Sequence, residues 1–136
     1  MVEITNKTIN VQQVIRKAQS PEAGGICVFI GTVRNHSRGR EIVALEYEAY
    51  EEMAAKTINE IRDEIRLKWD VRKIAISHRV GHLKVGDIAV VIAISAAHRK
   101  ESFAACQYAI DRLKETVPIW KKEISVDGES WIEPHA

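Results

Sequence analysis

The sequence predicts an α+β fold with a mixed, largely antiparallel sheet and about three helices. Two nearly continuous apolar runs, Gly25–Val33 and Ile88–Ala96, have the length and composition of buried strands. Three other segments repeat apolar residues at helical spacing. They are Val11–Ala18, Glu51–Lys68 and a segment from about Lys100 to Thr116.

A single domain is expected over residues 1–136, because domains commonly contain roughly 100–150 residues. The shares of hydrophobic residues (46%) and charged residues (29%) are ordinary for a globular protein. No apolar run reaches the roughly 20 residues needed to span a bilayer, and the first residues lack the pattern of a secretory signal. A cytoplasmic protein is therefore expected.

The first elements follow from local signals. Val11–Ala18 has one apolar face, and Asn10 can cap its first turn. Ser20–Gly25 reads as a turn. Gly25–Val33 is too short for a core helix and contains Gly31, so it is predicted to be a central strand that is buried on both faces.

The middle of the chain alternates between polar and apolar segments. Asn35–Arg40 is polar and contains a glycine, which predicts a mobile connection rather than a lid over a site. Ile42–Tyr50 is predicted to be a half-exposed strand with Val43, Leu45, Tyr47 and Ala49 on one face. The helix Glu51–Lys68 should bury Ala54, Ile58, Ile61 and Ile65.

The second half continues the pattern. Val71–His78 is predicted to be a strand, Gly81–Asp87 a turn region, and Ile88–Ala96 a second buried strand. Ile119–Val126 is the last predicted strand, and Trp131 marks an ordered tail. The helix between them should bury Phe103, Cys106, Ile110, Leu113 and Val117.

Two lysines, Lys114 and Lys121, lie on either side of Pro118. Proline has no N–H group and a fixed φ, so the helix should end before it and the chain should return as a strand. The two ammonium groups could then converge, bind an anion and lower each other's pKa. The alternative is a pair of solvated lysines near a helix end, where the helix dipole favours cations.

Other basic side chains follow the two buried strands. Arg34 comes after the first, and His98 and Arg99 come after the second, at the predicted start of a helix where backbone N–H groups favour an anion. Each residue alone is more often an ordinary surface group. Because the net charge is only +1, these local clusters suit a small anionic ligand better than a long polyanion.

Cysteine and histidine usage points away from disulfide and metal chemistry. Cys27 and Cys106 sit among apolar neighbours and are expected to be buried free thiols. His78 and His82 have a spacing that aligns metal ligands on a helix, but they lie in a segment predicted to be extended. We expect no metal site and no cofactor.

Five blocks in order along the chain resemble the large subunit of molybdopterin synthase, the MoaE family. The resemblance implies an α/β-hammerhead fold and a homodimer within a heterotetramer, completed by two copies of a small ubiquitin-like subunit. The blocks are Phe29–Arg34, Leu45–Tyr50, His78–Asp87, Ser95–Phe103 and Asp111–Glu123.

The resemblance also implies an activity. Family members are sulfurtransferases that take sulfur from a thiocarboxylate on the small subunit's C-terminal Gly-Gly tail. The acceptor is cyclic pyranopterin monophosphate, which becomes the dithiolene of molybdopterin. Because the tail supplies the sulfur, no reactive cysteine is required.

The family's residues carry over to matching positions. Lys114 and Lys121 match its catalytic lysines, with Lys114 as proton-transfer group or amine nucleophile and Lys121 as charge stabiliser. His98 and Arg99 can serve the pocket of the neighbouring large subunit. The substrate-binding positions are Thr32, Val33, Arg34, His98, Arg99, Lys114, Lys121, Lys122 and Glu123.

One departure and two alternatives remain open. After Trp131 the tail is shorter and less basic than is typical of the family, with His135 as the only candidate cation. The first alternative is a non-catalytic module that binds an anion, a nucleotide or RNA with the same basic residues. The second is a different acyl- or sulfur-transfer enzyme that accepts a ubiquitin-like tail.

Overall fold

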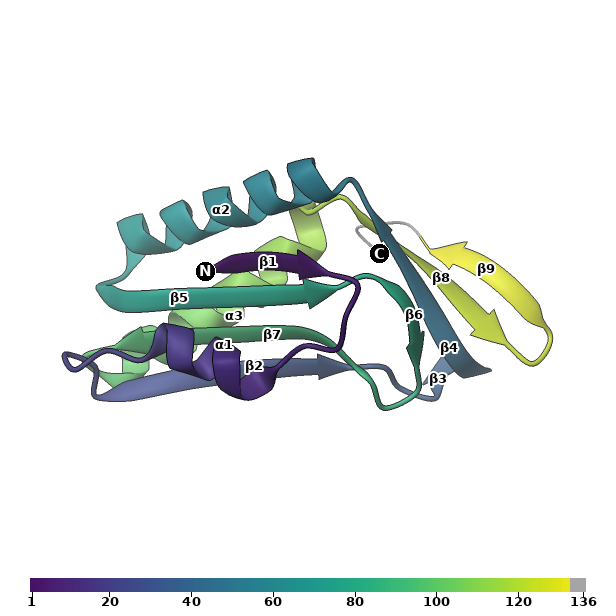
Figure 1. Cartoon of the computed structure of the whole chain (residues 1–136), viewed down its shortest axis with the longest axis horizontal. Coiled ribbons are helices and arrows are strands. Elements are labelled where there is room, and N and C mark those ends of the chain that lie inside the picture. The colour runs from purple at the N-terminus through teal and green to yellow at the C-terminus, as the bar shows by residue number, and fades with distance from the viewer. Residues whose placement is uncertain (133–136) are drawn as a thin grey trace.

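The computed structural model describes residues 1–132, which form three helices and nine strands (Figure 1). The three predicted helices and five predicted strands are all present, and four short strands are added. Among the described residues, no helix is both long and apolar enough to cross a membrane. The elements are β1 (Val2–Thr5), α1 (Val11–Ala18), β2 (Gly25–Thr32), β3 (His36–Ser37), β4 (Arg40–Ala49), α2 (Glu51–Lys68), β5 (Val71–Arg79), β6 (Gly81–Lys84), β7 (Ile88–Ala96), α3 (Arg99–Thr116), β8 (Ile119–Ser125) and β9 (Gly128–Ile132).

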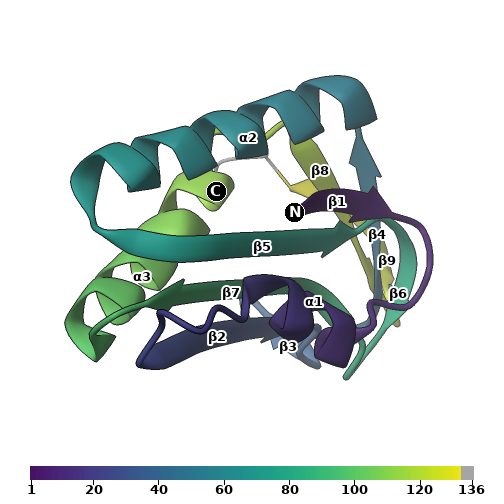
Figure 2. The same ribbon diagram turned by 60° about the vertical axis from the view of Figure 1, so that its left-hand side comes forward.

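The first sheet has the strand order β1-β5-β7-β2, and only the β1–β5 pair is parallel. Helix α1 covers one face, and α3 with α2 covers the other (Figure 2). The side chains of β7 alternate between the two cores. Val91 and Ala93 pack with α1, whereas Ile92 and Ile94 pack with the two long helices.

The second sheet lies at one end of the first and has the order β3-β4-β8-β9, with β6 also paired to β4 (Figure 1). A third core joins the two sheets; it contains Val33, Ile42, Leu45, Leu83 and Ala89. The predicted α+β class, with three helices and largely antiparallel strands, is confirmed, but the strands divide between two sheets.

Helices α1 and α2 begin and end at the predicted residues. The Asn10 side chain accepts a hydrogen bond from the Gln13 backbone N–H at 3.0 Å, as expected of an N-cap. In α2, the four residues predicted to be buried are at most 1% exposed: Ala54, Ile58, Ile61 and Ile65. Helix α3 ends at Thr116, before Pro118, and β8 begins at Ile119.

Strand β2 is not the central strand that its apolar run predicted. Among the described residues it pairs only with β7, so it forms one edge of the first sheet. Phe29 and Ile30 are 36% and 43% exposed. An apolar run predicts that a strand is shielded from water, but it does not show what covers the strand. An edge strand that is covered by another chain has the same sequence pattern.

Two predicted buried faces are shifted in the structure. Phe103 is 62% exposed, because α3 packs through small residues that allow a close approach to the sheet. Val43 is also exposed, since the register of the β4–β8 pair shifts between Ile42 and Ala44. The buried residues of α3 are Ser102, Ala105, Cys106, Ala109 and Leu113.

Two predicted loops contain regular structure. Asn35–Arg40 holds the β3–β4 hairpin, whose turn residues Arg38 and Gly39 have φ values of 54° and 76°. Positive φ at both positions suits a tight hairpin turn, so this segment is not an irregular connection. Gly81–Asp87 contains β6. Trp131 lies in β9, so the chain is regular up to Ile132, the last described residue.

The turn before β2 provides a stability test with a matched control. A Cβ atom at Gly24 would lie 2.3 Å from the Ala97 carbonyl oxygen, whereas one at Gly25 would have nothing within 4 Å. We expect Gly24→Ala to lower the free energy of unfolding by about 1–3 kcal/mol, because backbone must move to relieve the clash. Gly25→Ala should change it by at most about 0.5 kcal/mol. Urea unfolding of both variants measures the difference, and equal values would contradict this close packing.

Candidate functional site

A cavity of about 290 Å³ lies where the end of β2 meets the last turns of α3 and the start of β8. Lys114 and Lys121 both line it, so the predicted convergence of the two lysines is confirmed. Most of the other lining side chains are apolar. A pocket of this kind, apolar with a few polar groups, is typical of a site that orients a small ligand or a peptide tail.

The turn at Pro118 brings the two lysines together. Helix α3 ends with the Val117 N–H donating to the Leu113 carbonyl at 3.1 Å. Lys114 lies in the last turn of the helix, and Lys121 is the third residue of β8. The reversal between them is what places both side chains at one cavity.

Lys121 is only partly exposed, and its pKa is lowered chiefly by burial. The nearby cations Lys114, Arg34 and Arg38 lower this pKa further, while the Glu123 carboxylate opposes the shift. Four basic side chains therefore act on one site. Such a site favours an anionic ligand and makes the neutral form of the Lys121 amine more accessible.

Glu123 is 2% exposed and lies on the same face of β8 as Lys121. Lys121 pairs with Tyr47 of β4, which also lines the cavity. Burial, with a further contribution from Glu123, raises the pKa of Tyr47 to about 12. The Tyr47 phenol therefore stays protonated at neutral pH.

Lys122 lies on the opposite face of β8, away from the cavity. Its ammonium is 3.2 Å from a Glu46 oxygen and 3.6 Å from a Glu129 oxygen, and it lies 5.2 Å from the centre of the Trp131 ring. The hydrogen bond to Glu46, with a further contribution from Glu129, raises the pKa of Lys122. Within this chain, Lys122 of β8 therefore links to β4 through Glu46 and to β9 through Glu129.

The three matched positions after β2 differ in what they offer. Thr32 lines the cavity, and Arg34 is exposed and near enough to Lys121 to lower its pKa. Val33 is 3% exposed, its N–H donates to the Asp87 carbonyl at 3.0 Å, and its own carbonyl accepts from Gly86 at 2.7 Å. Val33 therefore anchors the segment, and its neighbours on either side present the polar groups.

His98 and Arg99 are exposed at the other end of α3. His98 is the N-cap residue, but its side chain makes no capping hydrogen bond. The helix rises about 1.5 Å per residue, so about 24 Å separates His98 from Lys114. A single chain does not bring these two residues to the cavity with Arg34.

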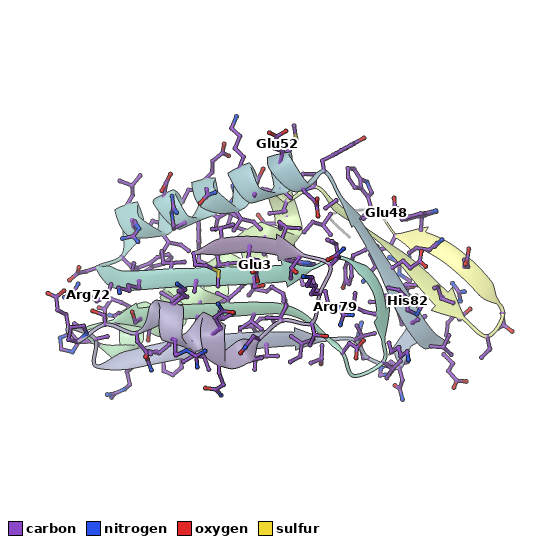
Figure 3. All side chains as sticks on the ribbon, viewed as in Figure 1. Glu3, Glu48, Glu52, Arg72, Arg79 and His82 are labelled. Atoms are coloured by element: carbon purple, nitrogen blue, oxygen red, sulfur yellow. The ribbon has the colours of Figure 1, made fainter. Side chains whose placement is uncertain are left out.

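The remaining candidates are also placed. Cys27 is half-buried and Cys106 is buried, and both are free thiols, as predicted. Burial raises the pKa of Cys106 to about 12, which makes it a poor nucleophile. His78 is buried on β5. His82 lies on β6 (Figure 3), and its Nδ1 is 3.6 Å from a Glu46 carboxylate oxygen. His135 lies outside the described residues.

No metal site is evident in the described part of the chain, where no three His, Cys, Asp or Glu side chains are suitably grouped. Sequence reasoning missed two polar residues of the cavity, Tyr47 and His78. Their rings meet edge to face, with centres 5.3 Å apart and planes at 81°. Both lie in blocks that resemble the MoaE family. The sequence signal that could have identified His78 was a histidine in an otherwise apolar strand.

The family model described as MoaE protein matches residues 4–116. The chain belongs to the MoaE family. A molybdopterin synthase catalytic subunit from Bacillus subtilis (strain 168) is 52% identical to this MoaE-family chain over 130 residues, which cover 96% of the chain and 83% of the relative. The human catalytic subunit is 43% identical over 131 residues, 96% of this chain and 70% of that protein.

Solved structures agree with the MoaE assignment. Molybdopterin synthase from Staphylococcus aureus has a TM-score of 0.92 and 45% identity, covering 96% of this chain and 95% of that one. A complex of subunits 1 and 2 of the molybdopterin-converting factor from Helicobacter pylori has a TM-score of 0.79. At 18% identity, the latter shows the shared fold alone. The fold expected from the resemblance is confirmed.

Proposed function

We propose that this chain is the catalytic subunit of molybdopterin synthase, a cytoplasmic sulfurtransferase. It transfers sulfur from the thiocarboxylated C-terminus of a small ubiquitin-like subunit to cyclic pyranopterin monophosphate and so forms the molybdopterin dithiolene. The convergence of Lys114 and Lys121 in one cavity beside Arg34 carries this proposal. The names of the relatives support it, as does the name of the Staphylococcus aureus structure.

The cavity suits the reaction's two anions, the thiocarboxylate and the cyclic phosphate. In each transfer, the thiocarboxylate sulfur forms a bond to a substrate carbon, and that carbon gives up a carbon–oxygen bond. The displaced oxygen leaves with protons as water or stays on the phosphate when the cyclic ester opens. Water then splits the bond between the sulfur and the acyl carbon. The tail is released as a carboxylate. Lys121 stabilises the negative charge that develops in these steps, because a desolvated ammonium interacts strongly with an anion.

Lys114 is the proton-transfer group in this proposal, with a transient amine nucleophile as the second option. It lies in the last turn of a helix that the sheet holds in place. A rigid element of this kind keeps a reacting group within reach of its substrate. No cysteine takes part, which fits the buried thiol of Cys106.

The binding set is completed by His98 and Arg99 of a second copy of the chain. Within one chain, about 24 Å of helix separates His98 from Lys114. Residues on one chain that are too far apart to share a site can share one across a two-fold axis. The proposed homodimer therefore places each His98–Arg99 pair at the partner's cavity.

The exposed edge of β2 supports such a dimer. At its start Gly25 pairs with Ala96, two residues before His98, whereas its end leads to Arg34. If two copies join antiparallel along this edge, the start of one β2 lies beside the end of the other. The exposed Phe29 and Ile30 would be covered by the same contact.

Reconstitution tests the proposed function. The chain is mixed with a thiocarboxylated small subunit and cyclic pyranopterin monophosphate, and the dithiolene product is measured. We expect product from the wild-type chain. An inactive wild-type chain beside a competent partner would overturn the proposal, and salt-dependent RNA binding without turnover would favour the binding module.

The pH dependence of this reaction tests the role of Lys121. Glu123 raises the Lys121 pKa, so Glu123→Gln should lower it further below its ordinary value of 10.5. The ammonium is then lost at a lower pH, and the alkaline fall in kcat/KM should move to lower pH. Glu129→Gln is the matched control, because Glu129 pairs with Lys122 on the other face. A fall that stays in place in Glu123→Gln would show that Lys121 need not be charged.

A further inference from the structure

His78 lies at the cavity but has no role in the proposed reaction so far. It sits near the end of β5, is 5% exposed, and lines the same cavity as Lys114 and Lys121. Its ring packs edge to face against Tyr47. A positively charged imidazole at this position would be disfavoured by burial and by repulsion from the neighbouring lysines. The role of His78 must therefore be one that a neutral ring can fill.

The hydrogen bond of His78 identifies which ring nitrogen carries the proton. Nδ1 is 2.8 Å from the backbone carbonyl oxygen of Arg79, the residue at the end of β5. A carbonyl oxygen only accepts, so Nδ1 must donate. Burial, with a further contribution from Lys114, lowers the pKa of His78 to about 4. The ring is therefore neutral at pH 7, and Nε2 carries a lone pair and no proton.

Nε2 is available to a ligand. It has no hydrogen-bond partner among the described residues. It is also absent from the fully buried, unpartnered side-chain atoms of those residues, so part of its surface is accessible. The other polar side chains of the cavity are donors only, as for the two lysines, or hydroxyls that can donate or accept. Nε2 is thus the one cavity side-chain atom in the described structure that can accept and never donate at pH 7.

We propose that Nε2 of His78 accepts a hydrogen bond from an N–H group of the ligand that fills this cavity. His78 is then a binding residue that fixes the orientation of the ligand between the two lysines. Both components of the proposed reaction carry such donors: the pterin has ring N–H groups, and the small subunit's tail has peptide N–H groups. The inference therefore rests on the proposed function for the identity of these ligands.

Two substitutions separate ligand binding from a structural role. His78→Asn keeps an N–H group near the Nδ1 position for the Arg79 carbonyl but has no acceptor at the Nε2 position. His78→Gln places an amide oxygen near Nε2 and gives up the bond to Arg79. We expect His78→Asn to weaken ligand binding by about 10-fold to 100-fold, because a buried donor of the ligand loses its partner. His78→Gln should stay within a few-fold of the wild type.

Calorimetry with each ligand alone identifies the source of the donor. One titration uses cyclic pyranopterin monophosphate, and the other uses the small subunit in its unreactive carboxylate form. The ligand whose affinity falls in His78→Asn is the one that donates to His78. Unchanged affinity for both ligands in a folded His78→Asn variant would overturn the inference, as would equal losses in the two variants.

A measurement on the wild-type chain covers the case in which a variant does not fold. The ¹⁵N resonance of an unprotonated Nε2 moves to lower frequency when it accepts a hydrogen bond. We expect this shift for His78 when the cavity is filled by the ligand, and an unmoved resonance at saturation would overturn the inference. Dithiolene formation by the wild type is scored separately, so failure of the proposed function and failure of the His78 contact give different results.

Discussion

Lys114→Ala is expected to lower kcat for dithiolene formation by about 10²-fold to 10⁴-fold, the usual contribution of a positioned proton-transfer group. The substitution removes the amine from the last turn of α3 and leaves the apolar side chains that bury the helix in place. The complex with the small subunit should therefore still assemble. Steady-state turnover at saturating substrate, with sedimentation of the same samples, measures both quantities.

Lys56→Ala is the matched control for this loss. Lys56 is an exposed lysine on α2 that does not line the cavity, and its removal should leave kcat unchanged. If Lys114→Ala retains wild-type kcat, Lys114 does not take part in the reaction. If it loses activity only because the subunits no longer assemble, its role is structural.

Mixed dimers are expected to regain activity that neither parent has. Arg99→Ala and Lys114→Ala homodimers each carry one defect in every site. If Arg99 serves the partner's cavity, a dimer with one chain of each kind has one site with both defects and one site with none. Two different affinity tags allow this mixed dimer to be isolated, and its activity should be about half that of the wild type.

The alternative arrangement makes a different prediction for the same sample. If Arg99 and Lys114 act in the cavity of their own chain, every site in the mixed dimer has one defect and no activity returns. A mixed dimer of two Lys114→Ala chains with different tags provides the inactive reference. Activity near that reference would contradict a site shared between copies, despite the separation along α3.

The parts of the fold with strong local signals could be predicted from the sequence. The stripe on α2 has a four, three and four spacing, and the helix was predicted residue by residue. The turn at Pro118 was predicted because proline acts through its own covalent structure rather than through distant contacts. That turn was enough to predict the meeting of Lys114 and Lys121.

Features that depend on tertiary packing could not be predicted in this way. Phe103 follows the helical spacing, yet α3 turns its alanine face to the sheet and leaves Phe103 exposed. The apolar run of β2 does not show whether the same chain or another covers it. The bulge that exposes Val43 arises from pairing with β8, a strand distant in sequence.

In the site, too, local signals could be predicted from the sequence, whereas features that depend on tertiary packing could not. Strand alternation alone separates Lys121 from Lys122, but which face meets the cavity depends on how β8 pairs with β4. Glu123 follows Lys121 by two residues and shares its face, as the sequence suggested. His78 could be recognised as a cavity residue only when β5, α3 and β8 were brought together.

Labelled sulfur tests the central claim most directly. The small subunit is prepared with ³⁵S in its terminal thiocarboxylate and is combined with the wild-type chain and cyclic pyranopterin monophosphate. The account predicts that ³⁵S leaves the tail and appears in the dithiolene product, while Lys114→Ala leaves it on the tail. Product without the label, or label that stays on the tail in the wild-type complex, would contradict the transfer of sulfur at this cavity.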